Sequence, residues 1–315
     1  MCGIVGYVGH ENALAPVING LKTLEYRGYD SAGVTYLDHG KFITIKQAGR
    51  VQSLEESLSK QQGKKSGLSI GHTRWATHGA PTQNNAHPHQ NSTGTVSVVH
   101  NGIIENYQEL KKFLQDKGYS FRSETDTEVI PQMIDYQLSK EKTFNKAFEA
   151  TLNLLRGAYA IAAVYSLTPD KLYVAKLSSP LVIGVGKNEH YVASDPTAIM
   201  NHTKKVIFLK DYELAVLTPA SVKIRNVKKS VNVKRQAELL DFDFEQASLG
   251  DYPHFMLKEI FEAPQTVRAA TLGRIKPELS SVRLGGFDSV AQQLRFIDRI
   301  IIVACGTSYY AGMVG

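Results

Sequence analysis

The feature that most constrains the fold is a series of short apolar segments between Ala158 and Val233. Turn-forming residues separate the segments, and several alternate apolar with polar residues, which is the period of a strand with one buried face. They predict strands at residues 159–165, 172–175, 181–185, 191–193, 206–209, 214–217 and 222–225. So many short strands need two sheets or one large sheet, with the helices of the preceding sequence covering the faces. We therefore expect residues 2–238 to form a single αββα sandwich.

The N-terminal sequence Met1-Cys2-Gly3-Ile4-Val5-Gly6-Tyr7-Val8-Gly9 combines a predicted first strand with a cysteine at its exposed start. If Met1 is removed, Cys2 carries both a thiol and a free α-amino group. An α-amino group has a pKa of about 7.7 to 8, so it can act as the base that ionises a thiol of pKa about 8.5. In the alternative interpretation Cys2 only packs, as small free cysteines commonly do. These residues alone leave both interpretations open.

Composition restricts the environment and the partners. The chain has 315 residues and two cysteines, Cys2 and Cys305, at opposite ends without a disulfide pattern, which indicates a reducing compartment. We find no signal peptide and no apolar run long enough to cross a bilayer, so we expect a cytoplasmic protein without a membrane partner. Part of the net charge of +6 lies in residues 223–229, where basic and apolar residues alternate as on the solvent face of a strand. We therefore do not expect nucleic acid as a partner.

Three polar motifs offer groups that suit an amino-acid substrate. They are residues 71–79, 100–106 and 123–128. The guanidinium of Arg74 is a planar fork that fits a carboxylate. Asn101 places a side-chain amide beside the backbone N–H of Gly102, and two such donors can form an oxyanion hole, although Asn-Gly is first of all a turn signal. Asp126 either caps the helix that follows or pairs with a substrate ammonium.

Other polar residues have simpler interpretations beside the functional ones. Arg27 and Asp30, in a glycine-flanked turn, form either a surface ion pair or part of a site. Histidines occur at positions 72, 78, 87, 89 and 100. Lone histidines of this kind are usually ordinary loop or core residues, and neither cysteines nor a second pair accompany His87-Pro88-His89, so we expect no metal. Gly184-Val185-Gly186 lacks the following helix of a dinucleotide-binding motif, and we expect no cofactor.

The C-terminal part is predicted to be a separate region. Residues 239–258 form a predicted linker, and residues 259–315 contain helical stretches and a final apolar segment. That segment, residues 299–304, is predicted as a buried strand that turns into a helix start at Thr307 and Ser308, where backbone N–H groups can hold a phosphate. A parallel strand buried on both faces needs neighbouring strands, and the sequence offers none after it.

Together the motifs resemble the glutamine-dependent glucosamine-fructose-6-phosphate aminotransferases (isomerizing), also called glucosamine-6-phosphate synthases, over essentially the whole chain. The motifs are residues 2–6, 25–33, 71–79, 85–89, 100–106, 123–128 and 305–308. Tyr26 and Tyr29 favour this family over the related phosphoribosyl-pyrophosphate amidotransferases, and Cys305-Gly306-Thr307-Ser308 favours a sugar isomerase domain. The sequence departs from the family at residues 177–180, where a more basic, glycine-containing loop is usual. The resemblance implies an N-terminal nucleophile fold of the class II glutamine amidotransferases.

The resemblance also implies roles for the candidate residues. Cys2, freed from Met1, would attack the amide of L-glutamine with its own amine as base, while Asn101 and Gly102 stabilise the oxyanion. Arg74 would hold the glutamine carboxylate and Asp126 its ammonium. The remaining family positions line or support the pocket: Thr77, His78 and Gly79 as its lining, Trp75 as the gate to an ammonia channel, and Arg27 and His87 as supporting residues. A γ-glutamyl thioester would form, release ammonia, and be hydrolysed to glutamate.

In the family the ammonia passes to a second domain of two sugar isomerase lobes, where D-fructose 6-phosphate becomes D-glucosamine 6-phosphate. Residues 259–315 would be an incomplete first lobe, with Thr307 and Ser308 in its first phosphate-binding loop and the isomerising lysines and glutamate beyond its end. From these residues alone we expect glutaminase activity only, and a homo-oligomer when the protein is full length. The competing hypothesis is a catalytically idle fragment that binds glutamine or assembles with other chains.

Overall fold

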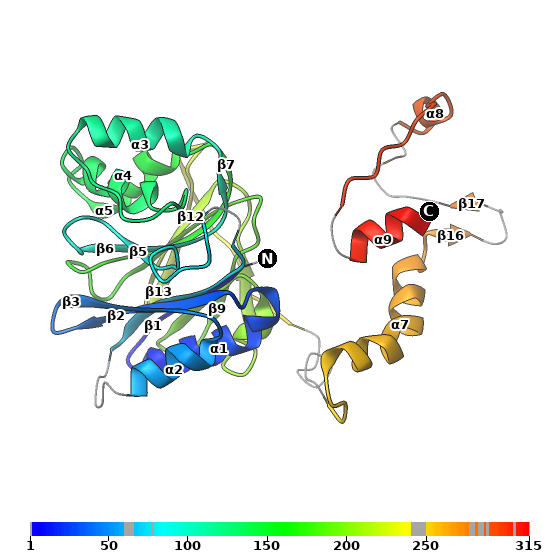
Figure 1. Cartoon of the computed structure of the whole chain (residues 1–315), viewed down its shortest axis with the longest axis horizontal. Helices are drawn as coiled ribbons and strands as arrows, with labels where there is room; N and C mark the ends of the chain where they lie inside the picture. Colours follow the sequence, from blue (N-terminus) through cyan, green and yellow to red (C-terminus); the bar gives the residue numbers. More distant parts are fainter. Residues whose placement is uncertain are drawn as a thin grey trace. The chain divides into compact units, whose positions relative to one another are not determined.

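The computed structural model contains two antiparallel sheets that face each other, with helices on their outer faces (Figure 1). The structure describes residues 2–59, 66–76, 79–240, 250–276, 281–282, 287, 290–304 and 307–314. The chain divides into two compact units, Met1–Ala247 and Ser248–Gly315. Within the described residues, no helix has the length and apolar character needed to span a bilayer.

The first sheet has eight strands in the order β15-β11-β9-β10-β1-β4-β2-β3. Their bounds are β1 Gly3–Val8, β2 Ser31–Asp38, β3 Lys41–Ala48, β4 Leu68–Arg74, β9 Val182–Val185, β10 His190–Ala193, β11 Lys205–Phe208 and β15 Glu238–Leu239. Central β1 pairs with β4, Gly3 opposite Thr73, and with β10, Val5 opposite Ala193. Every residue of β1 is buried, which explains why its sequence is apolar throughout rather than alternating.

The second sheet has seven strands in the order β14-β13-β12-β8-β7-β6-β5. Their bounds are β5 His89–Gln90, β6 Val96–Ile104, β7 Gly157–Tyr165, β8 Leu172–Leu177, β12 Glu213–Thr218, β13 Ser221–Asn226 and β14 Val231–Val233. In β13 the side chain of Ile224 is buried whereas Lys223 is exposed. The alternating basic residues therefore lie on the outer face of a strand, as the sequence predicts.

Three apolar clusters hold the four layers together. One lies between the sheets and joins Ile4 and Ile70 of the first sheet to Val99 and Val174 of the second. A second packs α1 (Leu14–Leu24) and α2 (Val51–Ser59) on the first sheet. A third packs α3 (Tyr107–Asp116), α4 (Val129–Leu138) and α5 (Phe144–Leu152) on the second. This arrangement confirms the predicted αββα sandwich.

The predicted strands between residues 158 and 233 all form, within a residue or two of their expected ends. Asp195 accepts a hydrogen bond from the Thr197 N–H and so caps the short 3₁₀ helix Pro196–Ala198. A second 3₁₀ helix, Glu25–Arg27, precedes β2. The strands β5, β14 and β15 are two or three residues long, and the sequence analysis does not predict them.

The second unit contains α7 (Phe255–Thr271), α8 (Ala291–Leu294), α9 (Thr307–Val314) and the short ladder of β16 (Ile275–Lys276) with β17 (Ser281–Val282). The predicted buried strand at residues 299–304 is wrong, because these residues form no strand and Ile300, Ile301 and Val303 are exposed. A strand exists only where a neighbour takes its backbone hydrogen bonds. The structure pairs β16 only with β17 and pairs residues 299–304 with no described strand.

Candidate active site

The N-terminal end of β1 brings Cys2 next to the C-terminal end of β4. Because Gly3 lies opposite Thr73, the residue that follows Arg74 reaches Cys2. The backbone N–H of Trp75 donates to Cys2 Sγ over 3.2 Å, and the Cys2 thiol lies 3.5 Å from the Trp75 carbonyl oxygen. Cys2 is partly buried, so the thiol sits at the edge of the protein rather than in its core. This position leaves the thiol close to the polar groups of the neighbouring segments, and the catalytic role of Cys2 stays a prediction.

Asn101, on β6 of the other sheet, also contacts Cys2. Its Nδ2 donates to the Cys2 carbonyl oxygen over 3.0 Å. Its Oδ1 lies 2.9 Å from Nε2 of His72, which also lies 3.1 Å from the His100 carbonyl oxygen. Both of those partners are acceptors, so the Nε2 of His72 carries the hydrogen. His72 therefore fixes the orientation of the Asn101 amide, and this positioning role is absent from the sequence analysis.

Gly102 occupies a position that only glycine fits. Its φ is 128°, and a Cβ there would lie 2.0 Å from the carbonyl oxygen of Ala158 on β7. A side chain would push apart the β6–β7 ladder, in which Gly102 lies opposite Tyr159. The glycine thus brings the backbone of β6 close to Cys2 while the sheet stays intact.

The guanidinium of Arg74 is buried and holds the loop that follows β4. Its Nη1 donates to the Ala80 carbonyl oxygen over 3.1 Å, and Nη2 donates to the Gly79 carbonyl oxygen over 3.2 Å. Gly79 has a φ of 77°, and a Cβ there would lie 2.7 Å from Nδ2 of Asn85. Thr77 and His78, two predicted pocket residues, lie outside the described residues.

Asp126 is buried beside the end of β6. Its Oδ2 accepts the backbone N–H of Ile104 over 2.7 Å, and its Oδ1 lies 3.4 Å from the Thr127 hydroxyl. The helix that follows, α4, has Glu128 as its N-cap residue and no acidic residue in its first turn. The interpretation of Asp126 as a helix cap or first-turn acid is therefore wrong.

These groups meet around one small space, which we call the Cys2 cavity. Its lining includes Cys2, Arg74, Trp75, His87, Gly102 and Asp126, and its volume is about 20 Å³. Such a volume holds about one water molecule and not a molecule of glutamine. Side chains that are far apart in the sequence thus surround the thiol, but a substrate has to displace part of the wall to reach it.

The thiol of Cys2 needs a base in this environment. Burial raises its pKa above the usual range, and the Asp30 carboxylate acts in the same direction. The backbone hydrogen bond from Trp75 and the charge of Arg74 lower the pKa, but they do not outweigh burial. A thiol of raised pKa is mainly protonated near neutral pH, so nucleophilic attack requires a group that removes the proton.

Arg27 and Asp30 support the site from behind. Buried Arg27 pairs with Asp195 over 3.1 Å, which ties the 3₁₀ helix before β2 to the end of β10. The Asp30 carboxylate accepts the backbone N–H of Ala76, and the Asp30 N–H donates to the Arg74 carbonyl oxygen over 3.2 Å. Trp75 is half exposed and meets the ring of Tyr29 edge-on at 6.0 Å. Asp30 therefore helps to fix the backbone beside the cysteine.

Four histidines, His72, His87, His89 and His100, lie together at the Cys2 cavity, and His87 and His100 line it. The rings of His72 and His87 are 4.1 Å apart, and those of His87 and His89 are 4.9 Å apart. Burial lowers the pKa of His72 to about 3 and also lowers the pKa values of His87 and His89 well below the usual range. Among the residues that the structure describes, no group of His, Cys, Asp or Glu side chains is arranged to hold a metal ion.

Thr307 and Ser308 lie in the second unit, at the start of α9, and Ser308 is exposed. A helix start at these residues agrees with the sequence prediction.

Comparison with known proteins finds similar sequences and structures. Residues 72–201 match the model of a glutamine amidotransferase domain. The structure is similar to glutamine phosphoribosylpyrophosphate amidotransferase from B. subtilis, with a TM-score of 0.62 and 28% sequence identity over 72% of this chain and 49% of that one.

Curated relatives match the chain along its whole length. Glutamine–fructose-6-phosphate aminotransferase (isomerizing) from Chlorobaculum tepidum is 45% identical over 319 aligned residues, which cover 100% of this chain and 52% of that protein. The protein of the same name from Thermococcus kodakarensis is also 45% identical, over 100% of this chain and 51% of its own length. The chain thus spans about half the length of the curated relatives that it matches.

Proposed function

We propose that this chain, a member of the glutamine amidotransferases and a relative over its whole length of the glutamine–fructose-6-phosphate aminotransferases, hydrolyses L-glutamine to glutamate and ammonia through a thioester on Cys2. The observation that carries the proposal is the Cys2 cavity. A thiol, a guanidinium and a carboxylate from three separate segments line it, and the Asn101 amide binds the carbonyl oxygen of Cys2. Hydrolysis of glutamine needs a nucleophile, a cation for the substrate carboxylate, an anion for the substrate ammonium and a donor for the oxyanion. These four protein groups can supply them.

In the proposed first step, Sγ of Cys2 forms a bond to the side-chain amide carbon of glutamine, and the thiol proton passes to the α-amine of Cys2. This step requires the removal of Met1. The amide Nδ2 of Asn101 has two hydrogens, and one already binds the Cys2 carbonyl oxygen. The second, together with the Gly102 N–H, would hold the oxyanion. The C–N bond then breaks, and the amine returns its proton to the departing ammonia.

In the second step a water molecule adds to the thioester, and glutamate leaves with regeneration of the thiol. Arg74 would bind the substrate carboxylate and Asp126 the substrate ammonium. Because the guanidinium of Arg74 now holds the carbonyl oxygens of Gly79 and Ala80, substrate entry would replace these bonds and shift Gly79 and Ala80. This movement would open a cavity that now holds about one water.

We further propose that the ammonia serves the conversion of D-fructose 6-phosphate to D-glucosamine 6-phosphate in a longer protein. The support is the name of the curated relatives and the extent of the match, which includes residues 259–315. In this proposal residues 2–238 are the glutaminase domain, residues 239–258 the linker and residues 259–315 the start of a sugar isomerase lobe with Thr307 and Ser308 at its phosphate loop. The cytoplasmic location and the homo-oligomeric state stay predictions from the sequence.

The test is glutamate release from L-glutamine by the 315-residue chain and by Cys2→Ala, with the intact mass of both proteins measured. We expect release by the unmodified chain only, together with a mass that shows the loss of Met1. Release that persists in Cys2→Ala contradicts the proposal. If the mass shows that Met1 is absent and the unmodified chain still releases no glutamate, the idle-fragment hypothesis replaces it.

A further inference from the structure

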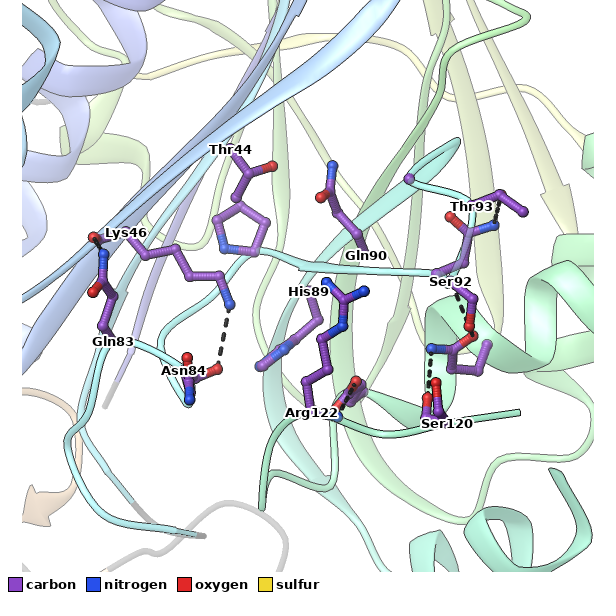
Figure 2. A pocket seen from close by; sticks show the side chains of 15 residues that line it. Thr44, Lys46, Gln83, Asn84, His89, Gln90, Ser92, Thr93, Ser120 and Arg122 are labelled. Carbon is purple, nitrogen blue, oxygen red and sulfur yellow. Dashed lines mark hydrogen bonds between the residues drawn. The ribbon is translucent and has the colours of Figure 1, made fainter. Parts of the chain in front are cut away.

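A second hollow in the first unit, which we call the Lys46 pocket, is far larger than the Cys2 cavity. Its volume is about 580 Å³, which is within the range of small-molecule sites, about 300 to 1,000 Å³. Its walls come from β3, the segment 83–94 and the segment 120–132 (Figure 2). The proposed glutaminase reaction uses none of the side chains that point into it.

Two cationic side chains enter the pocket from different walls. Lys46 comes from β3, and its Nζ donates to the Asn84 carbonyl oxygen over 3.3 Å, which leaves two of its three hydrogens for other acceptors. Arg122 enters from the segment that precedes α4, and Figure 2 shows its guanidinium pointing toward the segment of His89 and Gln90. The hydrogen bonds from Arg122 to Glu128 come from its backbone N–H, so they do not occupy the guanidinium.

The one carboxylate among the described residues of the pocket wall, Glu128, balances at most one of the two positive charges. Glu128 is buried, and it accepts the backbone N–H groups of Arg122 and Ser123 and the Ser123 hydroxyl, at 2.7 to 3.1 Å. A carboxylate with so many donors is stabilised where it is and does not need Lys46 or Arg122 as a counter-ion. The pocket therefore retains a positive character that suits an anion.

The rest of the wall is polar as well. It carries hydroxyl and amide side chains, among them Thr44, Asn84, Gln90, Ser92 and Ser120. No phenylalanine, tyrosine or tryptophan is among the described residues that line it. Most small-molecule sites are lined mainly by apolar and aromatic groups, so this wall selects against flat or apolar ligands and favours a molecule with many hydroxyl groups.

We propose that the Lys46 pocket binds a phosphorylated polyol of sugar-phosphate size, with the phosphoryl group between Lys46 and Arg122 and the hydroxyl groups on the surrounding amides and hydroxyls. The proposal does not depend on glutaminase activity, because it concerns a different hollow and a different ligand.

The test is isothermal titration calorimetry of the 315-residue chain with glucose 6-phosphate, glucose and inorganic phosphate. We expect glucose 6-phosphate to bind more tightly than either of the other two. Lys46→Gln and Arg122→Gln should each weaken its binding about 10- to 100-fold, which is the usual worth of a hydrogen bond to a charged group. The matched controls are Lys41→Gln, at the exposed start of β3, and Arg156→Gln, an exposed arginine outside the pocket; both should bind as the unmodified chain does.

A pH series distinguishes the contribution of the Lys46 charge to ligand binding from a general effect of the charge of the protein. Burial lowers the pKa of Lys46 to about 8, with Glu128 opposing and Arg74 reinforcing the shift, while neighbouring His89 has a pKa lowered well below its usual range and is neutral. A phosphate monoester is already a dianion at these pH values. The affinity should therefore fall as Lys46 loses its proton between about pH 7 and pH 10, and Lys46→Arg should remove that fall because arginine stays charged.

The variant Ser308→Ala controls for the phosphate site proposed in the second unit. If Ser308→Ala abolishes binding while Lys46→Gln does not, the ligand binds in the second unit and the Lys46 pocket proposal is wrong. If inorganic phosphate binds as tightly as glucose 6-phosphate, the pocket is a simple anion site. That result contradicts the proposal that the pocket also recognises the sugar hydroxyl groups. Absence of binding by the unmodified chain contradicts the whole proposal.

Discussion

The Cys2 cavity and the Lys46 pocket share a wall but hold their polar groups in opposite ways. The Thr125 hydroxyl on the wall of the Cys2 cavity lies 3.1 Å from Nε2 of His89 on the wall of the Lys46 pocket. Around Cys2, each polar side chain is already bonded: Arg74 to carbonyl oxygens, Asp126 to a backbone N–H and Asn101 to His72. In the Lys46 pocket the side chain of Arg122 is exposed, and the hydrogen bonds from Arg122 to Glu128 come from its backbone N–H.

This difference indicates two kinds of site. Asn101 would keep its present partners while the oxyanion forms, which is the arrangement that stabilises a transition state, whereas Arg74 would exchange its carbonyl partners for the substrate carboxylate. Groups that face open space adapt to a ligand and contribute to its affinity instead. Substitutions around Cys2 should therefore lower kcat or raise KM for glutamine, whereas substitutions in the Lys46 pocket should leave both unchanged.

The largest effect is expected for Asn101→Ala. The change removes one proposed oxyanion donor, and one such donor is typically worth about 2.7 to 4 kcal/mol of barrier. We expect kcat for glutamate release to fall about 100- to 1,000-fold with little change in KM. Steady-state kinetics measure this, with Asn19→Ala, an exposed residue of α1, as the control. A loss below about fivefold would mean that Asn101 does not contact the oxyanion.

The next effect is expected for Arg74→Lys. Lysine keeps the charge but not the planar fork that binds a carboxylate through two hydrogen bonds. We expect KM for glutamine to rise about 10- to 100-fold, with a smaller decrease in kcat. Arg156→Lys is the matched control. An unchanged KM would mean that Arg74 only holds the loop at Gly79 and Ala80, as it does in the structure.

A smaller effect is expected for His72→Phe. Phenylalanine keeps a flat ring against His87 but removes the donor that orients the Asn101 amide, and a buried acceptor without its partner costs about 1 to 3 kcal/mol. We expect kcat to fall about 10-fold and the free energy of unfolding to fall with it. His72→Gln, which restores an N–H donor, should recover part of kcat. Equal loss of kcat in both variants would show that ring packing, not the hydrogen bond, is what matters.

The fold was predictable where local pattern and global arrangement agree. The strands from β7 to β13 alternate or are wholly apolar because each has a buried face, and that period is visible in the sequence. Residues 299–304 have the same apolar character, but a strand also needs a hydrogen-bonded neighbour, and the sequence offers no strand after them. The apolar pattern was therefore sufficient in the first unit and misleading in the second.

The candidate site was predictable where a residue type alone suggests chemistry. A terminal cysteine, an arginine and an Asn-Gly pair each suggest a role, and the resemblance to a family assigned these roles, which stay predictions. The role of His72 could not be predicted, because it depends on a contact between β4 and β6, which lie in different sheets. The bonded residues, His72 and Asn101, are 29 positions apart in the sequence. The Lys46 pocket was missed for the same reason, since its walls come from three separate segments.

The smallest effect is expected for Gln90→Leu, a change in the wall of the Lys46 pocket. Nε2 of Gln90 is buried and has no hydrogen-bond partner among the described residues, so this amide costs stability in the unliganded protein. Gln90→Leu should therefore leave the free energy of unfolding unchanged or raise it by up to about 1 kcal/mol, with kcat and KM for glutamine unchanged. Urea unfolding and glutamate release measure these quantities, and Gln108→Leu, on the exposed side of α3, is the control. A large loss of kcat in Gln90→Leu would show that the two hollows act as one site. The contact between His89 and Thr125 would then transmit a change in the Lys46 pocket to the residues around Cys2.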